Sequence, residues 1–147
     1  MVAITTLMHE RAGIGAASAI QVRRDLDELI AVVNERGLGG DLVIRQRIAE
    51  LKIGIEALRF GSLRALSQQM KFGIPGPEGS LVKWQWSDAN QALTELAMDV
   101  RGGEAPLVDD HWTYRFLRAR ANSIEGGTTE ILKNIVAERV LGLPRLR

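Results

Sequence analysis

The sequence has no cysteine and only two histidines among its 147 residues. Without cysteine there can be no disulfide, no thiolate nucleophile and no cysteine-bound zinc or iron–sulfur site. A di-iron carboxylate site in a helical bundle requires Glu-x-x-His pairs, and neither His9 nor His111 lies three residues after a glutamate. We therefore expect no metal site, and any chemistry must use oxygen-based groups or a cofactor.

The chain also lacks a strong charge of one sign and a long apolar run. Its formal net charge is +1 and its arginines are spread over several segments, so no nucleic-acid partner is expected. No run of about 18 apolar residues occurs, which predicts no membrane span. Charged residues in the first turns do not fit a signal peptide, so we expect a cytoplasmic or organelle-interior protein.

Proline is scarce too, and all four prolines fall outside the strongly periodic stretches. Apolar residues recur at spacings of three and four in three long stretches, which is the pattern of amphipathic helices. Together these features predict helices over roughly residues 1–35, 42–70 and 78–101. Glycine- and proline-rich segments separate these helices, and Asp41 is suited to cap the second one.

Two shorter helical segments are predicted after residue 101. Asp109 or Asp110 can cap the first, in which Trp112 faces inward. A glycine-rich break leads to the last helix, which Gly142 and Pro144 end. Long helices joined by short loops pack as antiparallel neighbours. The expected fold is therefore all-α, a single-domain up-down four-helix-type bundle with a short extra helix.

One glutamate near the start occupies an unusual position. Glu10 stands between Leu7 and Ile14, at the spacing that puts all three side chains on one face of a helix. Burial of an unpaired carboxylate costs several kcal/mol or forces the group to take a proton. Glu10 is therefore either tolerated at a frayed helix end or placed for chemistry.

A second candidate is the segment SIEGGTTEI, residues 123–131. Two glycines entering a helix leave backbone N–H groups uncovered at its positive end, a geometry suited to phosphate or another anion. Thr128 or Thr129 adds a hydroxyl. An ordinary helix start has the same pattern, so these residues alone leave both interpretations open.

The stretch RANSIEGGTTEILKNIVAERVLGLPR, residues 120–145, closely resembles the C-terminal signature of the acyl-CoA dehydrogenase family. These flavoproteins desaturate acyl-CoA thioesters between Cα and Cβ. The segment TTLMHERAGIGAA resembles the opening of the family's C-terminal bundle. The resemblance implies that residues 1–147 form this one helical domain, without the N-terminal helical and middle β domains. A start inside the first bundle helix is expected of an excised domain, a truncated reading frame or a deliberate fragment.

The resemblance also implies a base that takes the α-proton while the β-hydrogen leaves as hydride to the flavin N5. In most of the family this base is a glutamate in the loop before the last helix, where this chain has Gly126, with Glu125 one place earlier. A minority carry the base on the first bundle helix, immediately before an arginine. That position is Glu10, followed by Arg11. Glu10 is therefore the expected catalytic base and Glu125 the alternative.

FAD is the cofactor and an acyl-CoA the substrate that the resemblance implies. Arg11 and Gly127 are the implied substrate-binding residues. The residues implied to touch FAD, often the FAD of a neighbouring subunit, are Gly102, Gly103, Thr128 and Glu130.

Two positions depart from the family pattern. Asp99 stands where a glutamine is common, and a carboxylate there would repel the phosphates of the cofactor unless it is paired. Arg36 is the nearest counterpart of an arginine that usually reaches the pyrophosphate of the adjacent subunit's FAD. These departures lead to the hypothesis of a divergent branch with unlike subunits, in which this chain contributes the base and a partner contributes the missing flavin contacts.

The implied assembly is a dimer or tetramer of like or unlike subunits, formed through the bundle. The implied electron acceptor is an electron-transferring flavoprotein. The alternative function is a non-catalytic helical subunit or module that serves oligomerisation in a heteromeric dehydrogenase. The presence of stoichiometric FAD in the complete assembly separates the two functions.

Overall fold

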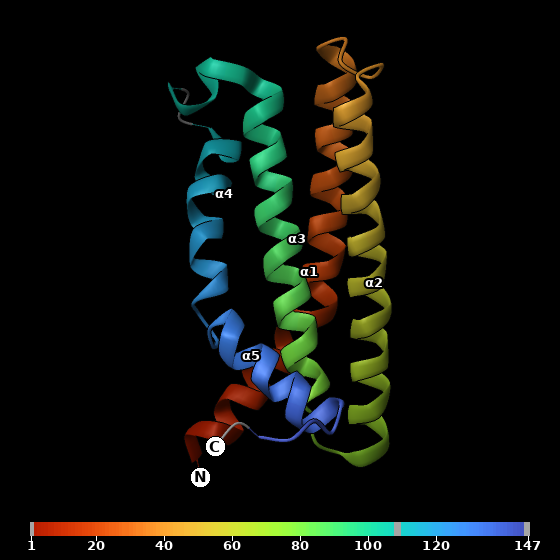
Figure 1. The fold of residues 1–147 in the computed structure, drawn as a ribbon, viewed down its shortest axis with the longest axis vertical. Coiled ribbons are helices and arrows are strands. Elements are labelled where there is room, and N and C mark those ends of the chain that lie inside the picture. The colour runs from red at the N-terminus through yellow and green to blue at the C-terminus, as the bar shows by residue number, and fades with distance from the viewer. Residues whose placement is uncertain (1, 108–109, 146–147) are drawn as a thin grey trace.

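Three long antiparallel helices form the body of the molecule (Figure 1). The structure is a computed structural model, and it describes residues 2–107 and 110–145. The description covers the side chains of these ranges except those of residues 2–5, 7–16, 104 and 106. The side chains of Glu10 and Arg11 therefore lie outside the described part. The long helices are α1 (Val2–Glu35), α2 (Leu42–Phe72) and α3 (Glu78–Arg101).

Shorter elements complete the bundle around α3. They are the 3₁₀ helix η1 (Gly102–Leu107), α4 (His111–Ala119), the 3₁₀ helix η2 (Arg120–Ser123), α5 (Thr129–Ile135) and the π-helical turn η3 (Val136–Val140). All of them, like α1 and α2, contact α3, which makes α3 the central helix. Within the described residues there is no strand and no helix long and apolar enough to cross a bilayer. The predicted all-α up-down bundle with a short extra helix is confirmed.

Capping residues fix the ends of α2 close to the predicted positions. The Asp41 carboxylate accepts hydrogen bonds from the backbone N–H groups of Val43, at 2.8 Å, and Ile44, at 3.0 Å. At the other end Gly73 has φ 75°, the left-handed conformation that glycine adopts without steric cost. The helix therefore continues to Phe72 rather than stopping at residue 70.

Asp110 caps α4, whereas Asp109 lies outside the described residues. The Asp110 carboxylate accepts hydrogen bonds from the N–H groups of Trp112, at 3.0 Å, and Thr113, at 3.1 Å. It also pairs with the guanidinium of Arg101, which ties the end of α3 to the start of α4. Desolvation alone would raise the pKa of Asp110, but these hydrogen bonds and the charge of Arg101 outweigh it and lower the pKa.

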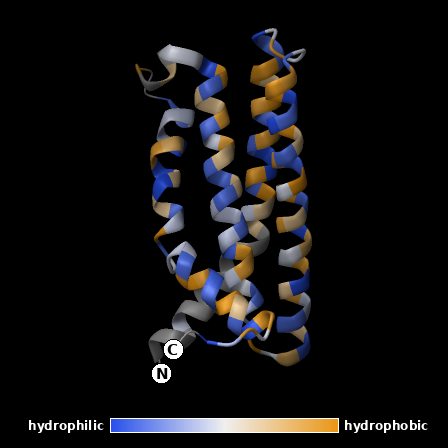
Figure 2. Ribbon diagram, viewed as in Figure 1, coloured by the Kyte–Doolittle hydropathy of each residue, from blue (hydrophilic) through white to orange (hydrophobic). Residues whose placement is uncertain are grey.

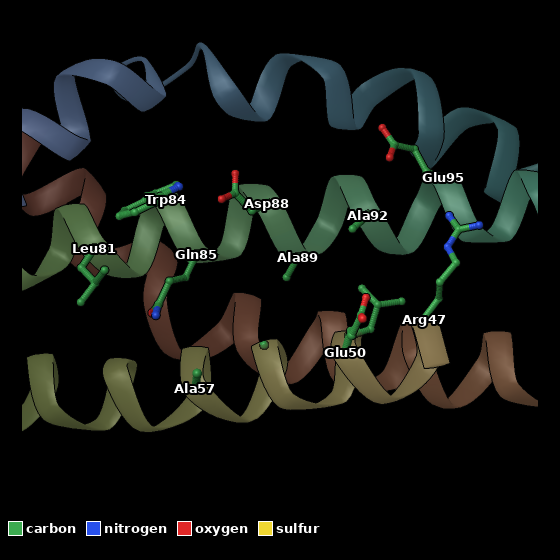
Figure 3. Close-up of a pocket in the computed structure, with 12 residues that line it drawn as sticks. Arg47, Glu50, Ala57, Leu81, Trp84, Gln85, Asp88, Ala89, Ala92 and Glu95 are labelled. Carbon is green, nitrogen blue, oxygen red and sulfur yellow. The ribbon is translucent and has the colours of Figure 1, made fainter. Parts of the chain in front are cut away.

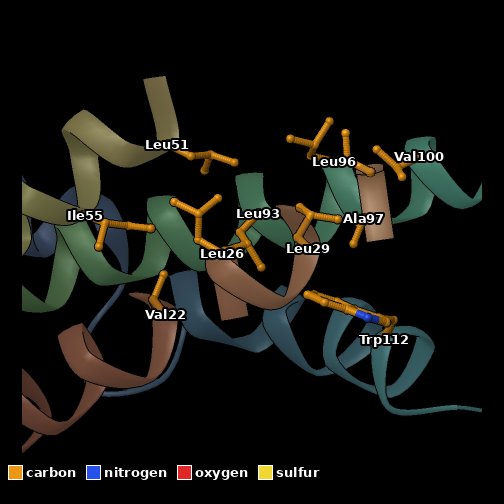
Figure 4. Close-up of a cluster of buried hydrophobic side chains, with 11 residues drawn as sticks. Val22, Leu26, Leu29, Leu51, Ile55, Leu93, Leu96, Ala97, Val100 and Trp112 are labelled. Carbon is orange, nitrogen blue, oxygen red and sulfur yellow. The ribbon is translucent and has the colours of Figure 1, made fainter. Parts of the chain in front are cut away.

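One apolar core runs between the long helices and reaches α4 (Figure 4). Its members repeat at the spacings of three and four that the sequence shows, so the predicted periodicity is confirmed. Trp112 from α4 is buried in the same cluster, as expected. The buried members are Val22, Leu26, Leu29, Val33, Leu51, Ile55, Leu93, Leu96, Ala97, Val100 and Trp112.

Apolar side chains also remain on the outer surface of α2, where hydrophobic and hydrophilic residues alternate along the helix (Figure 2). Ile53, Phe60 and Met70 are 71%, 60% and 79% exposed. Ile53 and Phe60 are seven residues apart, so they lie on one face of the helix, and Met70 lies about 80° round the helix from Phe60. An apolar face of this kind is typical of contact with another domain or subunit.

The core predicts a clear difference between two leucines. Leu26→Ala removes a side chain that is fully buried, so it is expected to lower the free energy of unfolding by about 2–5 kcal/mol. Leu117→Ala makes the same chemical change at a residue that is 64% exposed, and a loss below about 1 kcal/mol is expected. Equilibrium unfolding in urea measures both values. Equal losses would contradict the packing described above.

Candidate functional site

The glycine turn of residues 124–128 connects η2 to α5. Gly126 and Gly127 have φ values of 64° and 113°, a region that favours glycine over residues with a Cβ. The Thr128 hydroxyl oxygen accepts a hydrogen bond from the N–H of Ile131 and caps α5. The EGGTT segment is therefore an ordered connection whose shape depends on its two glycines.

Glu125, the alternative base, is held by two neighbouring side chains. Arg118 donates to both of its carboxylate oxygens, at 3.1 and 2.8 Å, and the Asn122 amide donates to Oε1 at 2.7 Å. The hydrogen bond from Arg118 is the largest influence and, against the opposing effect of desolvation, keeps the pKa of Glu125 below its ordinary value. The carboxylate is thus kept ionised and paired.

Glu130 lies in the first turn of α5 and is exposed. Its pKa is lowered, chiefly by the hydrogen bond from its own backbone N–H and then by the Thr128 hydroxyl. Glu125, Gly127, Thr128 and Glu130 are therefore brought together at one end of the bundle.

Side chains of α3 that sequence analysis did not single out fix this turn. The ammonium of Lys83 donates to the carbonyl oxygens of Asn122 and Gly127, the latter at 3.2 Å. The amide of Asn90 donates to the Asn122 side chain at 2.7 Å, and that of Gln91 to the Ala119 carbonyl at 2.9 Å. The turn is thus held from α3 by polar contacts.

The sequence does contain a signal for these contacts. Asn90 and Gln91 follow Lys83 by seven and eight residues, which is about two helical turns. The three side chains therefore form a polar stripe along one face of α3. The apolar repeat that predicts α3 occupies the adjacent face. A lysine, however, is normally expected in solvent, whereas Lys83 has 0% exposure.

The opposite end of α3 contains the other predicted cofactor residues. Gly102 ends α3 with φ 74°, and Gly103 follows in η1. A Cβ built on either glycine would meet no atom within 4 Å, so the backbone there is open to approach. Arg36 donates to the carbonyl oxygens of Val100, at 3.4 Å, and Arg101, at 3.0 Å, which places its guanidinium at the end of α3 just before Gly102.

Asp99, the position where the family commonly has glutamine, is an ion-pair partner here. Its carboxylate lies 2.6 Å from the guanidinium of Arg47 on α2. The pairing reduces the repulsion that an isolated carboxylate would exert on a nearby anion.

The predicted FAD residues therefore form two groups rather than one. Gly127 contacts Lys83 near the start of α3, whereas Gly102 follows its last residue. A helical rise of about 1.5 Å per residue puts roughly 28 Å between Lys83 and Gly102. Gly102 and Gly103 are thus distant from Thr128 and Glu130.

Comparison with known proteins identifies the chain. A family model described as the C-terminal domain of acyl-CoA dehydrogenases matches residues 1–141. The chain belongs to the acyl-CoA dehydrogenase family. The resemblance found in the sequence is confirmed.

Curated relatives with this family name come from mycobacteria. The acyl-CoA dehydrogenase IpdE1 of Mycolicibacterium smegmatis is 34% identical and is matched over 98% of this chain and 36% of its own length. IpdE1 of Mycobacterium tuberculosis is 35% identical over 98% of this chain and 38% of its length. FadE34 of Mycobacterium tuberculosis is 33% identical over 96% of this chain and 19% of its length. The chain thus spans well under half the length of these relatives.

Solved structures show the same fold. The Tcur3481-Tcur3483 steroid ACAD superimposes with a TM-score of 0.79 at 20% identity, covering 97% of this chain and 39% of that one. A crystal structure of a putative acyl-CoA dehydrogenase from Mycobacterium smegmatis gives 0.78 at 21% identity, covering 95% and 38%. At these identities the likeness concerns the fold alone.

The acyl-CoA dehydrogenase domain also has a groove of about 430 Å³ between α2 and α3 (Figure 3). Leu51, Ala57 and Ala89 are among its apolar lining residues. Figure 3 shows the charged Arg47 and Glu95 toward the same end of the groove. None of the predicted catalytic, substrate or FAD residues with a described side chain lines it.

Asp25 on α1 is a buried carboxylate of this domain that the sequence did not indicate. It is 4% exposed, pairs with Arg115 at 2.9 Å and accepts a hydrogen bond from Gln21 at 2.8 Å. Desolvation raises the pKa of Asp25 above its ordinary value, although Gln21 and Arg115 act in the opposite direction. Asp25 borders a hollow of about 440 Å³ that Trp86 and Asn90 also line.

Asp25 and Asp110 predict opposite pH dependences of stability. Because the pKa of Asp25 is raised by folding, the stability of wild type relative to Asp25→Asn falls as the pH rises above 3.8. The pKa of Asp110 is lowered, so the stability of wild type relative to Asp110→Asn falls as the pH drops below 3.8. Urea unfolding of the three proteins between about pH 3 and pH 6 measures both differences. The same sign for both aspartates would show that one of these environments is wrong.

Proposed function

We propose that this chain is the C-terminal helical domain of an FAD-dependent enzyme that desaturates an acyl-CoA thioester. In that reaction a base removes the α-proton, and FAD, when bound, would supply the acceptor for the β-hydride. Membership of the acyl-CoA dehydrogenase family supports the reaction class. The environment of Glu125 is the observation that carries the choice of base.

Glu125 is poorly suited to accept a proton from a carbon acid. Its oxygens accept hydrogen bonds from Arg118 and Asn122, and its pKa is lowered. A general base works best when its pKa lies near the operating pH. We therefore assign the base to Glu10, the residue that the family resemblance already favours over Glu125. The N-terminal end of α1 lies at the same end of the bundle as α5, which is consistent with this role (Figure 1).

Substrate contacts follow from the same assignment. Arg11 would contact the substrate next to the base, and Gly127 would let the turn approach the thioester closely because it has no side chain. Steroid-linked acyl-CoA thioesters are included among the candidate substrates, because one structural neighbour is a steroid ACAD.

The described residues fit an anionic cofactor at the end of α3. The open backbone of Gly102 and Gly103 and the guanidinium of Arg36 would hold a pyrophosphate there. At the other end an ionised Glu130 suits hydroxyl or N–H donors of a cofactor, and Thr128 offers a hydroxyl. Because roughly 28 Å separates the two ends, we infer that they contact different FAD molecules, one bound mainly by a neighbouring subunit. When bound, FAD supplies the hydride acceptor.

Assembly through the bundle is supported by the apolar face of α2. Ile53, Phe60 and Met70 would be covered by a second domain or subunit. We propose a dimer or tetramer of like or unlike subunits, an electron-transferring flavoprotein as acceptor, and a cytoplasmic location. The same apolar face also favours the second candidate function, a non-catalytic oligomerisation subunit.

The base assignment predicts different effects of two matched substitutions. In the complete flavoprotein that contains this chain, Glu10→Gln is expected to slow anaerobic flavin bleaching by acyl-CoA by about 100- to 10,000-fold while FAD stays bound. Glu125→Gln is expected to slow it by less than about tenfold, because Glu125 serves only the geometry of the turn. A panel of acyl-CoA thioesters, including steroid-linked ones, provides the substrates.

Two outcomes would contradict this proposal. Loss of bleaching in Glu125→Gln but not in Glu10→Gln would make Glu125 the base. Absence of stoichiometric FAD from the complete assembly would favour the non-catalytic subunit.

A further inference from the structure

Lys83 is the largest fully buried side chain of the described bundle. A buried ammonium is stable only when other groups replace the water that it loses, since an unpaired buried charge costs several kcal/mol. Two of the groups that do so are the carbonyl oxygens of Asn122 and Gly127. Neither is close to Lys83 in the sequence, because 39 and 44 residues separate them.

One of the two carbonyls lies just before the glycine turn and the other belongs to its second glycine. Asn122 belongs to η2, before the turn, and Gly127 lies immediately before Thr128, the cap of α5. One ammonium therefore joins the entry and the exit of the turn and anchors both to α3. A turn that contains two glycines has much conformational freedom in the absence of such contacts.

The same anchor extends to Glu125. The side chain of Asn122 accepts a hydrogen bond from Asn90 on α3 and donates one to Glu125. The positive charge of Lys83 also contributes to the lowered pKa of Glu125. Movement of Asn122 would therefore alter the pairing of Glu125 as well as the position of Gly127.

We propose that Lys83 is a positioning residue, which fixes residues 122–128, the end of η2 and the glycine turn, against α3 and so sets the place of Gly127 and Thr128 relative to substrate and flavin. In this role Lys83 does not contact the reacting atoms. This role of Lys83 rests on the proposed function, because the turn positions substrate only if the domain belongs to an active dehydrogenase.

Two variants test this role in the complete flavoprotein. Lys83→Met keeps a long side chain without donors. Lys133→Met is the matched control, because Lys133 is an exposed lysine on α5 whose ammonium lies 5.0 Å from the Trp84 ring. Backbone hydrogen exchange by mass spectrometry reports on the turn, and anaerobic stopped-flow reduction with excess FAD reports on catalysis.

Lys83→Met is expected to speed exchange in residues 122–128 at least about tenfold, with exchange in residues 51–58 of α2 unchanged. The flavin reduction rate at saturating acyl-CoA is expected to fall about 100-fold, since misplacement of a positioning group by about 1 Å has that effect. Lys133→Met is expected to match wild type in both measurements. This pattern separates local positioning from general loss of stability.

Lys83→Gln is measured in parallel, so that poor folding of the methionine variant does not decide the result. Its side chain is shorter than that of lysine and its amide carries two donors but no positive charge, so its contacts with the two carbonyls are weaker, and intermediate exchange and rate are expected. Wild-type exchange and rate in both Lys83 variants would overturn the proposal. A uniform rise of exchange in all helices would also overturn it, because Lys83 would then serve only general stability.

The outcomes distinguish this inference from the proposed function. If no acyl-CoA reduces the wild-type flavin, the proposed function fails, and with it the catalytic part of the inference. If wild type and Lys83→Met reduce flavin equally fast, the positioning role fails while the proposed function stands.

Discussion

The candidate site depends on the contact between the Lys83 ammonium and two carbonyl oxygens, that of Asn122 just before the glycine turn and that of Gly127 within it. A charge buried to this extent requires polar partners, so the turn and this part of α3 must form together. Asn90 and Gln91 add neutral hydrogen bonds to the Asn122 side chain and to the Ala119 carbonyl, which precede the turn. The shape of the turn is therefore a property of the packed bundle rather than of the EGG sequence alone.

The central position of α3 also explains how one small domain can present two distant groups of residues. Each end of the helix is tied to a neighbouring element by charged contacts, through Arg101 and Asp110 at one end and Lys83 at the other. Roughly 28 Å of helix separates these ends. A rigid connection of this length can fix one site relative to another in an assembly of several subunits, which the apolar face of α2 favours.

The fold could be predicted from the sequence because local rules determine it. Apolar spacing gave the three long helices, and Asp41 and Gly73 mark the ends of α2 by chemistry that needs no tertiary information. Asp110 was recognisable as a cap for the same reason. Because α2 extends to Phe72 rather than ending near residue 70, local rules located this helix end only to within about two residues.

The contacts within the site could not be predicted in this way. A lysine in a helix is expected on its solvated face, and only the packed bundle brings Lys83 to carbonyls about 40 residues away. The pairing of Glu125 with Arg118 depends on the path of the chain through η2, which has no periodic signal. Family resemblance named both glutamates as candidates, and the engagement of Glu125 provides a physical reason to prefer Glu10.

An experimental structure of the complete flavoprotein with a bound, unreactive acyl-CoA analogue would test the assignment of Glu10 as the base most directly. We expect the Glu10 carboxylate within about 3.5 Å of the carbon that stands for Cα, with Glu125 still paired to Arg118. A structure in which Glu125 leaves Arg118 and faces that carbon, with Glu10 turned away, would contradict it.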